Sequence, residues 1–205
     1  NENTIWNDLY VKDIRTKLGE ILAKSDHNKF NSKDYIVIGI PNSGIPSGKG
    51  YAKYLNLEYK QYITKNKKIQ RTFILKNNKE RTEMSNKKYI FNSELKNKNI
   101  IIVDDSIVRG ITLKTLIKNL KEFEVNEIHV RIAAPPIKFS CQYGIDIPNK
   151  NNLLVNKYNN NEIIENFNCN SIEFVNIDKI KEIIPHYNKL CTGCFNNNYN
   201  SSLEW

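Results

Sequence analysis

The chain has 205 residues, a formal net charge of +9 and a hydrophobic content of 40%. This length accommodates one medium-sized domain plus an extension, with a core large enough to fold without disulfides. No apolar run approaches the roughly 18 residues of a membrane span, and the N-terminus lacks the basic-then-apolar pattern of a signal peptide. We therefore expect a soluble, cytoplasmic protein with no membrane partner.

The positive charge by itself suggests an anionic partner. Lysine supplies most of it, and asparagine is even more abundant than lysine, with clusters at 159–161 and 196–198. Because A/T-rich codons favour both residues, part of the basicity reflects composition rather than function. No basic helix, aromatic-interleaved patch or zinc-finger spacing accompanies the charge. We predict no nucleic-acid partner.

The N-terminal half alternates between helical and extended patterns. Apolar residues recur at helical spacing from Leu9 to Lys24, and the apolar run from Tyr35 to Ile40 predicts a buried strand that ends in a turn. A helix from Ile45 to Leu55 and a strand from Glu58 to Ile63 are expected next. The stretch from Thr64 to Asn92 is polar and basic without periodicity, and we interpret it as a long flexible loop.

The C-terminal half continues the alternation. We predict strands and a helix in the order Asn99–Val103 (strand), Leu113–Phe123 (helix), Glu127–Ala133 (strand) and Ser171–Val175 (strand among short helices). Apolar strands alternating with helices are typical of an α/β fold with a central, mainly parallel sheet flanked by helices. We assign the domain to residues 1–185 and an irregular C-terminal extension to residues 186–205.

The segment from Ile100 to Thr112 carries the clearest chemistry. Its apolar strand delivers Asp104 and Asp105 to the carboxyl end, where open α/β sheets bind ligands. A loop containing Gly110 then leads into a helix whose first turn stabilises a phosphate. The acids can accept hydrogen bonds from vicinal sugar hydroxyls or help to hold Mg²⁺. A bare acid pair is usually solvated or caps the helix, but the whole segment predicts a ribose 5-phosphate site.

This segment resembles the signature by which type I phosphoribosyltransferases bind 5-phosphoribosyl-1-pyrophosphate (PRPP). Further segments are similar to the glutamine PRPP amidotransferase (amidophosphoribosyltransferase) family, in the same order along the chain: Arg15–Ala23, Ile38–Ser43, Lys65–Asn66, Arg71–Ile74, Ala134–Ile137 and Tyr143–Asp146. The Arg71–Ile74 and Tyr143–Asp146 segments are not shared by phosphoribosyltransferases in general. They narrow the resemblance to the amidotransferases, and the resemblance implies a type I phosphoribosyltransferase fold.

The resemblance also implies roles for individual residues. Ser43, Asp104 and Asp105 surround Mg²⁺ and the ribose, and the loop that binds the 5-phosphate consists of Ser106, Ile107, Val108, Arg109, Gly110, Ile111 and Thr112. The long loop closes over bound PRPP. Lys65 and Arg71 are candidates for neutralising pyrophosphate, and together with the two acids they form the catalytic set. The alternative is that both cations are surface charges on a polar loop.

The implied reaction is the first step of de novo purine biosynthesis. Ammonia displaces pyrophosphate at C1 of PRPP to give 5-phosphoribosylamine, and because ammonia attacks as the neutral base, we assign no general base. In the family an N-terminal glutaminase domain supplies the ammonia. This sequence does not encode that domain and begins with Asn1, so we expect a C-terminal half without glutaminase activity. A homo-oligomer and inhibition by purine nucleotides are further expectations.

The cysteines suggest a second cofactor. Cys191-Thr-Gly-Cys194 in a cytosolic chain indicates metal or redox chemistry rather than a disulfide. One branch of the amidotransferase family carries a [4Fe–4S] cluster held by four thiolates. Cys141, Cys191 and Cys194 match three of those ligands, and the fourth would lie upstream of this chain. Cys169 matches a small residue that leads into a strand, and we interpret it as a core cysteine.

Several positions depart from the family pattern. An acid, a glycine, an arginine and a threonine of the family are replaced here by Asn42, Gln70, Asn86 and Ile111, respectively, whereas Arg81 and Lys88 are retained. Together these changes leave open an enzyme whose activity is weakened or lost. Two other functions remain as alternatives: a salvage phosphoribosyltransferase that uses a free nucleobase, and a non-catalytic regulator that senses PRPP or nucleotides. The cysteine set argues against the first, and the lack of a recognisable DNA-binding module argues against the second.

Overall fold

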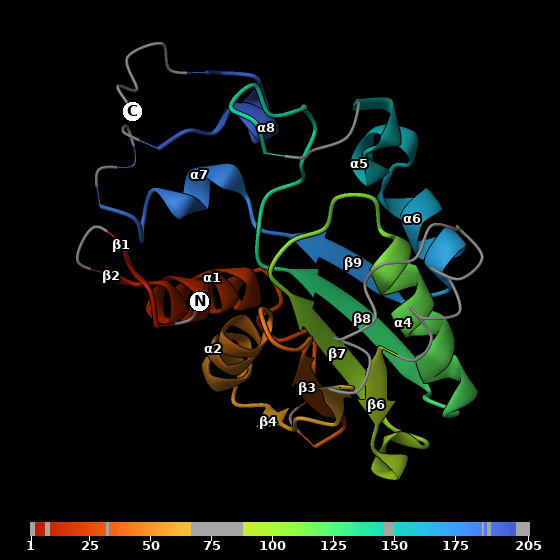
Figure 1. Ribbon diagram of the computed structural model, residues 1–205. Helices are drawn as coiled ribbons and strands as arrows, with labels where there is room; N and C mark the ends of the chain where they lie inside the picture. Colours follow the sequence, from red (N-terminus) through yellow and green to blue (C-terminus); the bar gives the residue numbers. More distant parts are fainter. Residues whose placement is uncertain are drawn as a thin grey trace.

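The computed structural model describes residues 3–6, 9–31, 33–66, 88–145, 150–185, 187 and 190–199. Within these residues, five parallel strands form the central sheet in the order β4-β3-β7-β8-β9 (Figure 1). Their bounds are β3 Tyr35–Gly39, β4 Glu58–Tyr59, β7 Asn99–Asp104, β8 Glu127–Ile132 and β9 Ser171–Phe174. The predicted α/β architecture is confirmed.

Helices cover both faces of the sheet (Figure 1). One face carries α1 (Val11–Lys24), α2 (Ile45–Leu55) and α7 (Ile177–Ile180), and the other carries α4 (Ile111–Glu122), α5 (Leu154–Lys157) and α6 (Asn160–Phe167). Strand β7 shows why its sequence is continuously apolar. Ile100 and Ile102 pack into the core under α4, whereas Ile101 and Val103 pack into the core under α1 and α2. A strand buried on both faces needs apolar residues at every position.

The first helix begins two residues later than its apolar spacing predicts. Leu9–Tyr10 forms β2, which pairs antiparallel with β1 (Ile5–Trp6), and Val11 N donates to Thr4 O at 2.9 Å to close the hairpin. Leu9 fits the helical period, but the backbone hydrogen bonds of the hairpin hold it in an extended conformation. Periodicity reflects the spacing of apolar side chains and does not indicate backbone pairing between strands.

The predicted strand from Glu58 to Ile63 is divided, and the predicted loop has paired ends. Strand β4 stops at Tyr59, and the Gln61 side-chain amide then donates to the carbonyl oxygens of Gly39 and Ile63 at 2.9 and 2.7 Å. The chain leaves the main sheet there. Strand β5 (Ile63–Lys65) pairs antiparallel with β6 (Tyr89–Phe91), so residues 63–65 and 89–91 are not loop. Residues 67–87 lie outside the described residues.

The C-terminal extension contains a short helix, α8 (Gly193–Asn196), where the sequence predicted irregular chain. The carbonyl oxygen of Cys194 accepts hydrogen bonds from the backbone of Lys138 and Phe139 at 2.9 and 3.0 Å. These bonds attach the extension to the segment that leads to Cys141. Short 3₁₀ turns occur at Ser93–Leu95 and Lys150–Asn152. In the described part of the chain, every helix is too short or too polar to cross a membrane.

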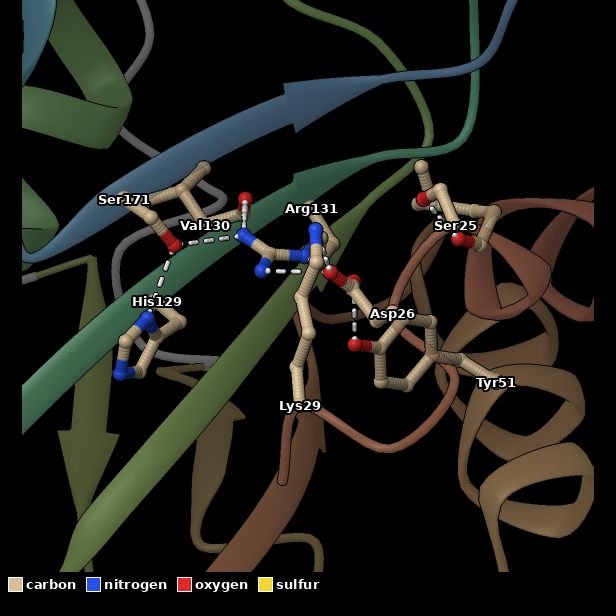
Figure 2. Close-up of polar contacts among 9 residues, drawn as sticks. Ser25, Asp26, Lys29, Tyr51, His129, Val130, Arg131 and Ser171 are labelled. Atoms are coloured by element: carbon tan, nitrogen blue, oxygen red, sulfur yellow. Dashed lines mark hydrogen bonds and ion pairs between the residues drawn. The ribbon is translucent and has the colours of Figure 1, made fainter.

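A buried ion pair joins the end of α1 to the sheet (Figure 2). Asp26 and Arg131 are 0% and 1% exposed, and Arg131 Nη2 lies 3.1 Å from Asp26 Oδ1. Asp26 also accepts a hydrogen bond from the Tyr51 hydroxyl at 2.7 Å and pairs with Lys29. Burial raises the pKa of Asp26, but Arg131, Tyr51 and Lys29 together outweigh burial and hold the pKa below its ordinary value of 3.8. The network fixes the C-terminal end of α1 to β8 and α2.

Candidate active site

Two adjacent carboxylates lie at the carboxyl end of β7. Asp104 is the last residue of the strand, and its Oδ1 accepts a hydrogen bond from Asp105 N at 2.9 Å. Burial, and then the charge of Asp105, raise the pKa of Asp104 to about 7, although the Asp105 amide and the charge of Lys88 oppose the shift. A carboxyl group with this pKa takes up a proton near neutrality. A cation bound beside it would favour the ionised form.

The turn between β3 and α2 packs directly against the acid pair. Ile40 N donates to Val103 O at 2.8 Å, which joins the ends of the two strands. A Cβ on Gly44 would lie 2.4 Å from Val103 O and 3.0 Å from Asp104 Cα, so only glycine fits there. Ser43 precedes this glycine and is half-buried. The structure therefore brings the turn that contains Ser43 to the acid pair.

The loop from Ser106 to Thr112 is anchored at Ile107, Val108 and Gly110 and exposes its other side chains. Ile107 is buried in the core, and Val108 O accepts a hydrogen bond from Leu154 N at 2.8 Å. Gly110 has a φ of 77° and lies so close to Phe167 that a Cβ would be 2.7 Å from its ring. Side chains of Ser106, Arg109, Ile111 and Thr112 are exposed.

Helix α4 starts directly after this loop and offers its first turn to a ligand. Among the described residues, no side chain caps this end, and Gly110 takes the N-cap position. The N–H groups of the first turn are free of helical partners, and the helix dipole favours an anion there. Ile111, which replaces the family threonine, is 64% exposed and has no hydroxyl for a phosphate. The side chain at position 111 therefore offers no hydrogen-bond donor to an anion.

Two lysines lie near each other, and one of them, Lys88, is within electrostatic range of Asp104. Lys65 of β5 is half-buried and lies opposite Tyr89 in the ladder with β6. Burial, and then the charge of Lys65, lower the pKa of Lys88, and the charge of Asp104 opposes that shift. The pKa of Lys88 thus responds to both Lys65 and Asp104, which places Lys88 near each of them. Arg71, the other predicted cation, lies outside the described residues.

Arg15 lies at the site, although the sequence alone assigns it no role. It projects from α1, and its guanidinium lies between two loops: Nη2 is 3.2 Å from Asp105 Oδ2, and Nη1 donates to Ser43 O at 3.3 Å. Both side chains of the ion pair are 27% exposed. Arg15 belongs to the Arg15–Ala23 segment, which resembles the amidotransferase family. Because a cation on an amphipathic helix is usually solvated, that segment alone assigns it no contact. Nothing in the pattern indicated that this helix faces the acid pair.

Three of the cysteines are neighbours, and the fourth is not. Burial first, then the thiolates of Cys191 and Cys141, raise the pKa of Cys194. The Tyr199 hydroxyl donates to Ser140 O, which brings the extension against the Cys141 segment. Even so, the described residues contain no group of three or more His, Cys, Asp or Glu side chains arranged to hold a metal ion. Cys169 is 7% exposed within the core, which confirms its interpretation as a core cysteine.

Comparison with known proteins is consistent with this site. Amidophosphoribosyltransferase from Methanothermobacter thermautotrophicus is 34% identical over 195 residues, which cover 94% of this chain and 40% of that protein. The human amidophosphoribosyltransferase is 30% identical over 231 residues, covering 99% of this chain and 44% of the relative. The chain thus spans about two fifths of the length of these relatives.

A solved structure agrees with the sequence relatives. The glutamine PRPP amidotransferase of B. subtilis, complexed with ADP and GMP, superposes with a TM-score of 0.83 at 28% identity, covering 97% of this chain and 44% of that one. The model of the phosphoribosyl transferase domain matches residues 7–174, which include the sheet, both loops and the acid pair. The chain therefore belongs to the phosphoribosyltransferase family.

Proposed function

We propose that this chain is the phosphoribosyl-transfer half of an amidophosphoribosyltransferase, in which ammonia displaces pyrophosphate from PRPP to give 5-phosphoribosylamine. The observation that carries the proposal is the convergence of Ser43, Asp104 and the uncapped start of α4 at one edge of the sheet, in a chain whose relatives bear that enzyme's name. A purine-biosynthetic role in the cytoplasm follows from the same proposal.

Different residues would bind the phosphate, the ribose and the pyrophosphate of PRPP. The backbone of Ser106–Thr112 binds the 5-phosphate, and the acids accept hydrogen bonds from the ribose hydroxyls. C1 becomes cation-like as pyrophosphate leaves, so a catalyst must mainly stabilise the leaving group and align the nucleophile. Lys65 and Arg71 are the proposed cations for that group, and Lys88 lies beside Lys65. Neutral ammonia attacks without a general base.

The acid pair fits a divalent cation. A largely buried carboxyl beside a second carboxylate has a raised pKa, and a bound cation relieves both the burial and the repulsion. Asp104, Asp105 and Ser43 would hold Mg²⁺, which when bound neutralises pyrophosphate oxygens. The whole enzyme would also have a glutaminase domain, purine-nucleotide inhibitors and a homo-oligomeric assembly. The length of the relatives supports the additional domain, and the nucleotides in the B. subtilis complex support nucleotide binding.

Pyrophosphate release tests the reaction type. With PRPP, Mg²⁺ and ammonium salts at alkaline pH, where more ammonia is neutral, we expect pyrophosphate release, and glutamine should not replace ammonium. Adenine, guanine and hypoxanthine serve as competing nucleophiles in parallel reactions. Faster release with a nucleobase would favour a salvage enzyme. Binding of PRPP without release by any nucleophile would favour a regulator.

We also propose that Cys141, Cys191 and Cys194 ligate a [4Fe–4S] cluster whose fourth thiolate lies upstream of this chain. Thiolates are the ligands that such clusters require. Besides burial, the charges of Cys191 and Cys141 raise the pKa of Cys194, which supports three neighbouring sulfurs. The cluster's role would be structural, holding the polar extension to the domain.

Anaerobic reconstitution with iron and sulfide analysis tests this ligand set. The longer parent protein should bind about four irons per chain, and Cys191→Ala or Cys194→Ala should remove them. Cys169→Ala is the matched control and should leave iron content unchanged. Loss of iron on Cys169→Ala would show that the ligand assignment is wrong.

A further inference from the structure

The two loops of the proposed PRPP site are linked by a side chain from a third element. Ser43 belongs to the turn after β3, and Asp105 follows β7, which is the neighbouring strand of the sheet. The guanidinium of Arg15, on α1, contacts the Ser43 carbonyl oxygen through Nη1 and the Asp105 carboxylate through Nη2. A planar guanidinium presents several N–H donors in a fixed fork, so one side chain can bind both partners at once.

The backbone that carries Arg15 is held by packing that does not involve these loops. A Cβ on Gly19 would lie 1.9 Å from Ser47 O, and a Cβ on Gly50 would lie 2.1 Å from Thr16 O, so the backbones of α1 and α2 are in direct contact. The far end of α1 is fixed by the ion pair between Asp26 and Arg131 (Figure 2). The guanidinium therefore extends from a rigid base and constrains the two loops.

The contact matters because it sets the direction of the Asp105 carboxylate. Its backbone N–H is used by Asp104 Oδ1, and its carboxylate Oδ2 is directed toward Arg15. A carboxylate that must receive ribose hydroxyls or a cation binds more tightly when its rotamer is set before the ligand arrives. The same guanidinium holds the Ser43 turn at a defined distance from that carboxylate.

We propose that Arg15 is a positioning residue for PRPP, which fixes the Asp105 carboxylate and the Ser43 turn relative to each other before substrate binds. This inference rests on the proposed function of the site. It predicts that removal of the guanidinium weakens PRPP binding while the fold is retained, because the contacts of Arg15 are part-buried and lie at the edge of the domain.

The test compares Arg15→Gln, Arg15→Lys and, as a matched control on the same helix, Lys17→Gln, whose side chain is exposed. We expect Arg15→Gln to raise the Kd for Mg²⁺–PRPP by about tenfold, as for the loss of a hydrogen bond to a charged group. The KM for PRPP should rise more than kcat falls, and the Tm should stay within a few degrees. Arg15→Lys should recover only part of the affinity, because a single ammonium lacks the fork.

Each other outcome has a defined meaning. Equal affinity in Arg15→Gln and the unsubstituted chain would overturn the positioning role, and tighter binding would identify Arg15 as an inhibitory counter-ion instead. Full recovery of PRPP affinity in Arg15→Lys would show that only the positive charge matters, and not the simultaneous contact with Ser43 and Asp105. Failure of the unsubstituted chain to bind PRPP would overturn the proposed function itself, and the role of Arg15 with it.

Discussion

Replacing Arg131 with methionine is expected to lower the free energy of unfolding by about 3–5 kcal/mol, the usual cost of leaving a buried charge without its partner. Asp26 is completely buried, and methionine fills much of the arginine volume without supplying its N–H donors. Tyr51 and Lys29 would remain as partners, but Arg131 is the largest contributor to the lowered pKa of Asp26. Denaturant unfolding monitored by circular dichroism measures the change.

The matched control is the double variant Asp26→Asn with Arg131→Met, which removes both charges and should recover part of the loss. The pH dependence gives an independent check. Because the folded pKa of Asp26 lies below 3.8, the pair stabilises the protein above that pH, and this stabilisation is lost as the pH falls through the folded value. The difference between the unsubstituted chain and Arg131→Met should therefore narrow in acid. A cost below about 1 kcal/mol at pH 7 would contradict the account.

Asp104→Asn is expected to abolish Mg²⁺-dependent PRPP binding and to stabilise the metal-free chain at pH 8. The pKa of Asp104 is raised to about 7, so the folded state binds this proton more tightly than the unfolded state. Ionisation then destabilises the fold progressively as the pH rises above about 4. Asparagine cannot ionise, and its side-chain oxygen can still accept the Asp105 N–H. We expect a gain on the order of 1–2 kcal/mol at pH 8.

Thermal unfolding in EDTA at pH 5 and pH 8, paired with calorimetric PRPP titration, measures both effects. Asp105→Asn is the control, since it also removes a charge from the pair but breaks the ion pair with Arg15. It should lose PRPP binding without the same gain in Tm. If Asp104→Asn destabilised the metal-free chain at pH 8, the raised pKa of the Asp104 carboxyl would be contradicted. Unchanged PRPP affinity in both variants would remove the acids from the site.

The central elements of the fold were predictable because each carries a strong local signal. Strand β7 is a run of β-branched residues buried on both faces. Helix α2 ends at its predicted residue, Leu55, and α4 begins two residues before the predicted Leu113. The elements that were misplaced depend on hydrogen bonds to distant residues. Gln61 ends the strand after Tyr59 by binding the backbone of Gly39, and no local pattern indicates that contact.

The same distinction applies to the site. Asp104 and the loop to Thr112 were predictable because strand, acids, glycine and helix follow one another along the chain. Arg15 could not be assigned, because its role arises only when α1 packs against α2 and faces a loop 90 positions away. Asp26 and Arg131 are separated by 105 positions and resemble surface charges in sequence. Contacts between distant charged residues are a product of the tertiary fold.

Calorimetric titration of the unsubstituted chain with PRPP, in Mg²⁺ and in EDTA, tests whether the acid pair and the loop that follows it bind PRPP. We expect saturable binding of one PRPP per chain, which requires Mg²⁺ and is displaced by pyrophosphate together with ribose 5-phosphate. Binding of equal strength in EDTA would contradict the role of the acid pair as a cation site. The absence of any binding at millimolar PRPP in Mg²⁺ would contradict the assignment of this site to PRPP.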